Sequence, residues 1–468
     1  MLFPTFDYFL FLPVVGLIHW ALQRRGARTA WLMVTSLVFY SAWNPADTVL
    51  LLTVIGVAFG AGLVVGRADA SRPRAGRWRL VVAVALLLSP MLYYKYLPWM
   101  TENLHALVPS ITAQPRRHLP IGVSFYSFQA VAYVIDVRRG QPVERNPIRF
   151  ATFLLFFPHL VAGPILRAST LLAQLNSDRR LLPADVGEGL ARLITGLVKK
   201  VLIADVLRVG IVDSVFTDPG RFTAFEVMTA LYAYSLQIYC DFSGYTDMAI
   251  GSARLFGFRI PENFDRPYQA LSVASYWRRW HMTLSDWVRD YVYYPMGGSR
   301  GGGVRPYVNT LVTLLILAVW HGANWTFVLY GLCHGVAVSL NRWWKKSGPG
   351  RHLPEPRGWG VVWRWALTFH FVVLARILFR AADLPQARDV TLSLLNLAPG
   401  LPRWSLHAWI VLGVGFVMHL TPRGWTGRAR TAFVALPAPL QGVILAATAW
   451  LCVEWGPGDT LAFIYHDF

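Results

Sequence analysis

Charged side chains are scarce in this sequence. Asp, Glu, Lys and Arg make up only 15% of its 468 residues, whereas soluble domains carry about 25%. Hydrophobic residues account for 55% of the chain, and the mean hydropathy is +0.41. These proportions exclude an ordinary soluble domain and predict a protein that is largely embedded in a lipid bilayer.

Cysteine is also rare. The three cysteines, Cys240, Cys333 and Cys452, lie in or beside apolar segments and lack the spacing of a metal site. We therefore expect inert, packed thiols, with neither a disulfide framework nor a bound metal. A cleavable signal peptide is not expected either, because the first arginines follow the first apolar run and do not precede it.

Acidic residues are few: 25 Asp and Glu face 44 Lys and Arg, which gives a net charge of +19. Such an excess can indicate nucleic-acid binding, but here the basic residues lie in short loops between apolar runs. They follow the first, third and fifth runs, as Arg24, Arg25 and Arg28, then Arg67, Arg72, Arg74, Arg77 and Arg79, then Arg138, Arg139, Arg145 and Arg149. The positive-inside rule places these loops in the cytoplasm and the N-terminus outside. Lipid headgroups are therefore the expected partners, and nucleic acid is not.

Long apolar runs are what the sequence does contain. They are Phe3 to Leu22, the shorter Thr29 to Trp43, Val49 to Gly66, Leu80 to Leu97, Leu119 to Ile135, Phe150 to Leu166, Ala224 to Ile250, Tyr307 to Leu340, Val361 to Phe379, Trp404 to Leu420 and Ala432 to Val453. Most approach the roughly 20 residues that span a bilayer as a helix. No long linker and no internal repeat divides them, so an all-α polytopic membrane protein with one domain over residues 1–468 is predicted.

Two segments depart from simple spans. Ser275 to Tyr294 (SYWRRWHMTLSDWVRDYVYY) mixes aromatic and charged residues, which predicts a helix that is interfacial or re-enters the bilayer inside protein. The run Tyr307 to Leu340 is too long for one span and is interrupted by Gly322-Ala323-Asn324, which predicts two helices that meet near His321. Pro158 and Pro164 similarly predict a break in the run Phe150 to Leu166.

His321 at this break and His281 in the aromatic segment are the candidate reactive groups. An imidazole in an apolar run is costly unless it is partnered or functional. A neutral histidine can accept the proton of a hydroxyl group, while a second polar group orients the substrate or stabilises charge. Taken alone, however, the two histidines are weak evidence: their spacing favours packed structural residues, and a transporter would also use buried histidines.

A series of motifs distinguishes these possibilities. They are PIGVSFYSFQ at 120–129, FPHLVAGP at 157–164, YCDFSGYTDMAIG at 239–251, PENFD at 261–265, YWRRWHMTLS at 276–285, YPMGGSR at 294–300, WHGANW at 320–325, YGLCHG at 330–335 and FIYHDF at 463–468. Together they closely resemble the membrane-bound O-acyltransferases, densely over about residues 119–335. DFSGY at 241–245 and YPMGGSR favour the bacterial alginate O-acetyltransferase branch.

The resemblance implies a bundle of about 11 transmembrane helices, with re-entrant or interfacial helices around a central tunnel. It implies transfer of an acetyl group from a cytoplasmic thioester, acetyl-CoA, to hydroxyls of an exported polysaccharide such as alginate. No bound cofactor and no metal are expected, since a thioester is already activated. The branch further implies location in the bacterial inner membrane and a periplasmic partner with the esterase (SGNH) fold that completes transfer to the glycan.

The resemblance also assigns residues. His321 matches the family's catalytic histidine, expected to act as general base, and His281 matches an upstream His or Asn partner that positions or polarises a reactant. Weaker substrate-binding candidates are Asn324, Asp241, Arg278, Arg279, His159, Trp280 and Trp320. For Asp241 an ion pair with Arg278 is expected, for Asn324 helix capping is an alternative, and Arg278 and Arg279 could meet either donor phosphates or lipids. His159 could line the donor path or simply be packed, and His334 is expected to be a packed histidine with a local partner.

Three other functions compete with acetyl transfer. D-alanyl transfer to a cell-envelope polymer shares the Arg279-Trp280-His281 core but usually departs at DFSGY and YPMGGSR. A membrane transporter would also use broken helices and buried histidines, although few acids lie in the apolar runs and no inverted repeat is visible. A non-catalytic scaffold of a polysaccharide export complex would tolerate replacement of His321.

Overall fold

The computed structural model describes residues 3, 5–67, 73–352, 357–400 and 402–458. In these residues every regular element is a helix and no strand occurs, which confirms the predicted all-α class. Arg72 and the FIYHDF motif at 463–468 lie outside the described residues. The chain divides into two compact units, Met1–Leu193 with Met248–Pro261 and Ile194–Asp247 with Glu262–Phe468. The expectation of a single acyltransferase domain stays a prediction.

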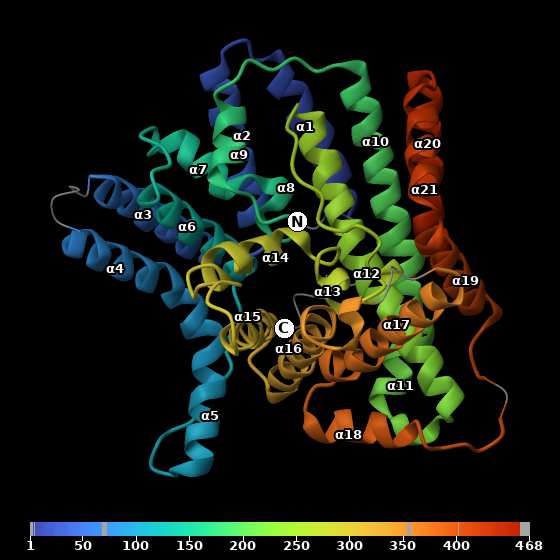
Figure 1. Ribbon diagram of the computed structural model, residues 1–468. Helices are drawn as coiled ribbons and strands as arrows, with labels where there is room; N and C mark the ends of the chain where they lie inside the picture. Colours follow the sequence, from blue (N-terminus) through green and yellow to red (C-terminus); the bar gives the residue numbers. More distant parts are fainter. Residues whose placement is uncertain (1–2, 4, 68–72, 353–356, 401, 459–468) are drawn as a thin grey trace. The chain divides into compact units, whose positions relative to one another are not determined.

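The first unit contains the N-terminal helices (blue to green in Figure 1). They are α1 (Phe6–Ala21), α2 (Arg25–Ser41), α3 (Pro45–Gly66), α4 (Pro73–Met91), the π-helix η1 (Leu92–Tyr96), α5 (Leu97–Leu107), α6 (Val123–Arg138), α7 (Pro147–Leu155), α8 (Phe157–Leu160), α9 (Ala168–Leu175) and most of α10 (Pro183–Leu197). Their starts follow local chemistry. Asn44 and Asn146 cap α3 and α7 with side-chain oxygens, and each is followed by a proline at the first helical position.

The second unit begins with the π-helices η2 (Val198–Asp205) and η3 (Arg208–Val212). The remaining elements are α11 (Asp213–Thr217), η4 (Pro219–Arg221), α12 (Ala224–Leu255), which ends in the first unit, η5 (Pro267–Gln269), α13 (Val273–Trp277), α14 (Met282–Val288), η6 (Arg289–Tyr293), α15 (Arg305–His321), α16 (Trp325–Lys346), η7 (Pro349–His352), α17 (Trp359–Arg380), α18 (Leu384–Ser393), α19 (Leu406–Leu420), α20 (Arg423–Val434) and α21 (Ala438–Trp455).

Several helices have the length and composition of membrane spans. Among the described residues four qualify by both measures, namely Pro45–Gly66, Gly76–Leu107, Trp359–Arg380 and Ala438–Trp455. Phe6–Ala21 and Leu406–Leu420 are apolar but shorter. Other predicted runs form helices that are short, such as α6 with 16 residues and α15 with 17. The expected number of about 11 spans therefore stays a prediction.

Several boundaries differ from the prediction. The run Phe150 to Leu166 is broken as expected: α7 ends at Leu155, α8 begins at Phe157 with Pro158 in its first turn, and α8 ends at Leu160 before Pro164. The run Ala432 to Val453 is not one helix, because α20 ends at Val434 and α21 starts at Ala438. Cys333 is exposed on α16, so the expected packed thiol is wrong at this position.

Glycines allow α10 and α12 to approach closely within each unit. In the second unit, a β-carbon added at Gly244 would lie 2.8 Å from the carbonyl oxygen of Gly196. In the first unit, a β-carbon added at Gly251 would lie 2.7 Å from the carbonyl oxygen of Gly189. Small residues of this kind let membrane helices pack backbone against backbone. The close approach matters for the site because it fixes α12 against the segment that follows α10.

Candidate active site

A tight helical hairpin positions His321. As predicted, the long apolar run forms two helices, α15 and α16, which lie side by side (Figure 1). Gly331 permits the contact, since an added β-carbon there would lie 2.9 Å from the Cα atom of Leu315. His321 is the last residue of α15 and is 1% exposed. The interruption at Gly322 to Asn324 thus places a buried imidazole at a helix end.

The hydrogen bond of His321 defines which nitrogen is basic. Its Nδ1 lies 2.8 Å from the carbonyl oxygen of Leu317. A carbonyl oxygen can only accept, so Nδ1 carries the proton in the neutral ring and Nε2 keeps its lone pair. The rings of Trp320, Phe327 and Phe379 surround the imidazole at centroid distances of 5.1, 6.4 and 5.2 Å. His321 is therefore held in the tautomer that a general base requires.

His281 lies in a turn and not within a helix. The predicted continuous helix from Ser275 to Tyr294 is wrong: α13 ends at Trp277, and α14 begins at Met282 with His281 as its N-cap in the left-handed region at φ 42°. Asn263 holds this turn from a distant part of the sequence. Its backbone carbonyl accepts from the N–H of Met282 at 2.9 Å, and its side-chain oxygen accepts from Nδ1 of His281 at 3.1 Å.

The same asparagine oxygen fixes the tautomer of His281. It also accepts from the backbone N–H and the hydroxyl of Thr283, at 3.2 and 2.9 Å, which identifies this atom as the oxygen of the amide. Nδ1 of His281 is therefore the donor, and Nε2 again carries the lone pair. The ring packs perpendicular to Phe242 of α12 at 4.7 Å. Both histidines consequently present the same ring nitrogen for chemistry.

Trp320 joins the two histidines. Its ring centroid lies 6.0 Å from that of His281 and 5.1 Å from that of His321. Burial and, after it, the charge of His321 lower the pKa of His281, which lies in the turn between α13 and α14 and outside the helices that could span a membrane. The structure thus brings together the two histidines and Trp320, three of the residues that the sequence selected.

Replacing Asn263 with alanine is expected to lower both stability and activity. The change leaves Nδ1 of His281 and two groups of Thr283 without their buried acceptor, at a cost of about 1–3 kcal/mol in the free energy of unfolding. Thermal unfolding in detergent and the acetyl transfer rate would measure the two effects. Asn309→Ala is the matched control, because Asn309 is buried in the same unit but donates to Met296 and Gly298. Equal transfer rates in the two variants would contradict a role for Asn263 in orienting His281.

Asp241 does not pair with Arg278 as expected. Its carboxylate lies 2.7 Å from the ammonium group of Lys200, and Asp205 lies 2.8 Å from the same nitrogen. All three side chains are at most 5% exposed. Lys200 and Asp205 belong to η2, whose i→i+5 hydrogen bonds bring residues five apart to one face. Arg278, by contrast, is exposed.

The other predicted site residues have varied environments. Trp280 is buried and stacks on Tyr276 at 5.7 Å, while Arg279 is half-buried and its carbonyl accepts from the N–H of Asp265. Asn324 caps α16 by accepting from the N–H of Thr326 at 3.1 Å, which is the alternative named for it. Their assignment to substrate binding stays a prediction.

Two other histidines of the family motifs, His159 and His334, are both buried. His159 lies in the first unit, fully buried, with Nδ1 3.2 Å from the amide nitrogen of Gln129. His334 accepts from the indole N–H of Trp277 at 3.2 Å, which confirms the expected packed histidine with a local partner. The role of His159 in a donor path stays a prediction.

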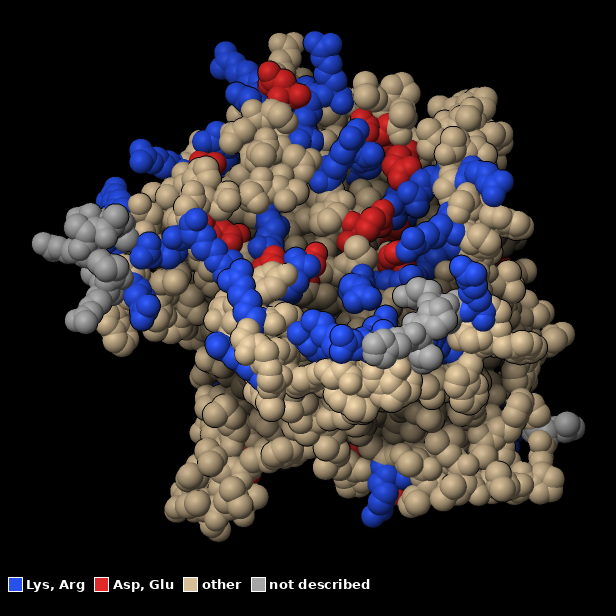
Figure 2. Space-filling model, viewed as in Figure 1, with Lys and Arg blue, Asp and Glu red and all other residues tan. Residues whose placement is uncertain are grey.

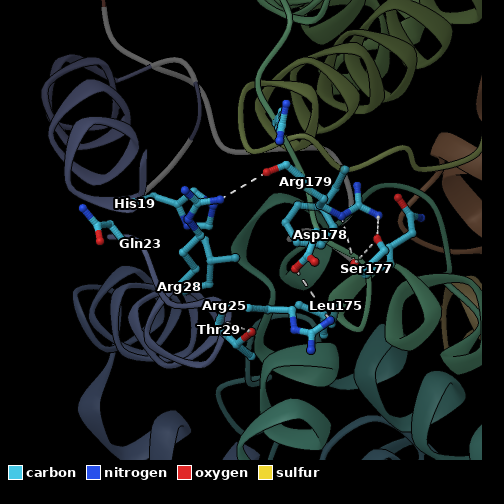
Figure 3. Close-up of a pocket in the computed structure, with 13 residues that line it drawn as sticks. His19, Gln23, Arg25, Arg28, Thr29, Leu175, Ser177, Asp178 and Arg179 are labelled. Carbon is cyan, nitrogen blue, oxygen red and sulfur yellow. Dashed lines mark hydrogen bonds and ion pairs between the residues drawn. The ribbon is translucent and has the colours of Figure 1, made fainter. Parts of the chain in front are cut away.

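A basic pocket lies in the first unit (Figure 3). Its cavity of about 250 Å³ is lined by His19, Gln23, Arg25, Arg28, Thr29, Leu32, Gln174, Leu175, Ser177, Asp178, Arg179, Arg180 and Phe258. Lys and Arg side chains gather around this end of α1, α2 and α9 in Figure 2. The guanidinium group of Arg28 donates to the carbonyl oxygens of Leu22 and Arg179, at 2.7 and 3.2 Å. Four arginines and one carboxylate make the pocket cationic, which suits the predicted contact with lipid headgroups.

Three buried polar residues in or near the site were not predicted from the sequence. Asn263 lies within the PENFD motif, but nothing in its spacing indicated that it would orient His281. Lys200 belongs to a Lys-Lys pair that resembles an ordinary loop charge. Arg376 is fully buried in α17 and could have been noticed as a cation inside an apolar run. Among the described residues, no cluster of three or more His, Cys, Asp and Glu side chains is arranged to hold a metal ion.

Comparison with known proteins identifies relatives of the chain. Residues 35–380 match the sequence profile described as MBOAT, membrane-bound O-acyltransferase family. The chain is 38% identical to a protein named "Probable alginate O-acetylase" from Azotobacter vinelandii, over 95% of this chain and 90% of the relative. It is 40% identical to a protein of the same name from Pseudomonas syringae pv. tomato, over 80% of this chain and 71% of the relative. A peptidoglycan O-acetyltransferase from Helicobacter pylori is 32% identical, over 83% and 78% of the two chains.

Proposed function

Because this chain belongs to the membrane-bound O-acyltransferase family, we propose that it transfers an acetyl group from acetyl-CoA to hydroxyl groups of an exported polysaccharide. The names of its relatives support both the acetyl group and a cell-surface polymer as acceptor. The observation that carries the proposal is the buried His321 with its proton held on Nδ1 by Leu317. That arrangement supplies a general base at the end of α15.

The reaction follows from this geometry. Nε2 of His321 accepts the proton of the acceptor hydroxyl as its oxygen forms a bond to the thioester carbonyl carbon. The carbon–sulfur bond then breaks, and the CoA thiolate takes the proton from His321. His281, which shares contact with Trp320, positions or polarises a reactant beside the base. A thioester is already an activated acyl donor, so these groups complete the chemistry.

The membrane arrangement is part of the same proposal. About 11 spans and re-entrant segments surround a tunnel in which the cytoplasmic donor meets the exported acceptor, with the N-terminus outside the bacterial inner membrane. The turn at His281, which separates α13 from α14, supports a re-entrant segment. Trp280 and Trp320 line the reactant site, and Arg278 and Arg279 meet donor phosphates. A periplasmic protein with the esterase fold completes transfer to the glycan.

Labelled transfer in membrane vesicles tests the proposal. Inverted vesicles from cells that contain the chain and its neighbouring export proteins receive radiolabelled acetyl-CoA on their outer, formerly cytoplasmic, face. We expect label to appear in polymer or partner protein inside the vesicles. Vesicles from cells that lack only this chain provide the control. Failure to transfer label from acetyl-CoA or any other acyl thioester would contradict the proposed enzymatic function.

A further inference from the structure

Arg376 is a fully buried cation without an acidic partner. It lies in the middle of α17 and is 0% exposed. No carboxylate of the described residues forms an ion pair with it, unlike Arg380 one turn later, which lies 2.9 Å from Asp213. A buried charge is expensive and is usually paired with an opposite charge. Groups other than a carboxylate must therefore hold this guanidinium group in place.

Aromatic side chains form that environment. The guanidinium carbon lies 4.4 Å from the ring centre of Trp280 and 5.2 Å from that of Phe379, and one nitrogen donates to the hydroxyl of Tyr276 at 2.6 Å. Cation–π contacts are stronger when the cation is desolvated, as it is here. These contacts hold the cation without a carboxylate.

Donor groups of this cage are left over. Nε and Nη1 of Arg376 are buried and make no regular hydrogen bond in the described part of the chain, and the nearby hydroxyl of Tyr268 already donates to the carbonyl oxygen of Ser235. The buried hydroxyls of Tyr234, from α12, and Tyr330, from α16, likewise have no hydrogen-bond partner there. These groups come from three helices, and Phe379 contacts both the guanidinium group of Arg376 and the ring of Tyr330, at 5.2 Å in each case. A negatively charged oxygen would satisfy these groups together.

The cage adjoins the proposed base. Phe379 contacts Arg376 on one side, and its ring centre lies 5.2 Å from those of both His321 and Tyr330. Trp280 connects Arg376 to His281 through Phe264 and Phe242, with successive ring distances of 5.1, 5.1 and 4.7 Å. The unpaired cation therefore belongs to the aromatic layer that also encloses both histidines.

We propose that Arg376, with the hydroxyls of Tyr234 and Tyr330, forms an anion-binding site for the oxygen of the reacting acyl group. This inference rests on the proposed acetyl transfer. As the acceptor oxygen bonds to the carbonyl carbon and its proton passes to His321, the carbonyl π electrons move to oxygen, which becomes negative. Arg376 stabilises that oxygen until the double bond re-forms and the thiolate departs. The negative charge on the oxygen exists only during the reaction. In the resting enzyme the aromatic side chains alone hold the positively charged arginine.

Substitutions of Arg376 test this assignment in the vesicle assay. For Arg376→Met we expect kcat to fall by about 10²- to 10³-fold, as when one oxyanion donor is removed, with the KM for acetyl-CoA nearly unchanged. Arg376→Lys keeps the charge and should lose less. Arg380→Met is the matched control on the same helix, where the arginine is half-buried and ion-paired, and its kcat per folded molecule should stay normal.

A milder variant covers the case in which Arg376→Met does not fold. Tyr330→Phe keeps the ring and removes one donor, so kcat should fall by about 10- to 100-fold, the value of one hydrogen bond to a charged group. Fluorescence-detected gel filtration reports the folded amount of each variant. Normal kcat in folded Arg376→Met and Tyr330→Phe would overturn the site. A change in acceptor KM alone would also overturn it, because a substrate carboxylate would then be the ligand.

His321→Ala separates this inference from the function on which it rests. If His321→Ala is inactive while Arg376→Met is normal, the anion site is wrong and the general base stands. If Arg376→Met loses kcat while His321→Ala transfers acetyl groups normally, the base is wrong and the anion site stands.

Discussion

Replacing His321 with alanine is expected to lower the rate of acetyl transfer by about 10²- to 10⁴-fold, the usual contribution of a general base. The expected loss is chemical and not structural. His321 ends α15, and its Nδ1 forms a local hydrogen bond to the carbonyl oxygen of Leu317 within the same helix. Removing the ring therefore leaves the hairpin of α15 and α16 intact while the acceptor hydroxyl keeps its proton. Initial rates of label transfer, normalised to folded protein, measure the effect.

His370 provides a closely matched control. It lies in α17, and its Nδ1 makes the same kind of bond, 2.7 Å from the carbonyl oxygen of Ala366 four residues earlier. Its Nε2, however, lies 2.8 Å from the hydroxyl of Tyr232, outside the site. His370→Ala should transfer acetyl groups at the normal rate. Equal rates for the two alanine variants would remove His321 from the mechanism and would favour a scaffold function.

Replacing Lys200 with methionine is expected to destabilise the protein by about 3–5 kcal/mol, the cost of breaking a buried ion pair from one side. The substitution leaves Asp205 and Asp241 facing each other with no cation between them. Both carboxylates are almost completely buried, so solvent screens their mutual repulsion only weakly. We expect the variant to accumulate poorly in membranes and to unfold at a lower temperature than the native protein.

Neutralising the acids should restore stability. The triple variant Lys200→Met, Asp205→Asn, Asp241→Asn removes all three charges together, and replacing a whole buried charge cluster is often neutral. Asp205→Asn alone serves as the mild control, since it keeps the pair between Lys200 and Asp241. If Lys200→Met unfolds at the same temperature as the native protein, the triad does not stabilise the packing of η2 on α12.

Continuous patterns made much of the fold predictable. The unbroken apolar runs from Val361 to Phe379 and from Trp404 to Leu420 became α17 and α19 with shifts of at most two residues at either end. The break before Asn324 was also predictable, because a glycine and a capping residue adjoin there. The family motifs correctly identified the acyltransferase family from the same stretch of sequence.

Partners supplied from distant segments were not predictable. The turn at His281 depends on hydrogen bonds from Asn263, 18 residues earlier, so the local sequence still read as one helix. Asp241 was expected to pair with Arg278 because a carboxylate inside an apolar run needs a cationic partner. Its actual partner, Lys200, precedes it by 41 positions and comes from a π-helix, whose register no apolar periodicity reveals.

The left-handed backbone of His281 limits which amino acids can occupy this position at all. Apart from glycine, Asn, Asp and His adopt such a conformation most readily, and branched side chains are strained in it. At φ 42° the turn therefore disfavours most other amino acids, whether or not a reactant is bound. The resemblance allowed His or Asn at this place, and both belong to that short set. Backbone geometry, as much as catalysis, thus decides how position 281 can vary during evolution.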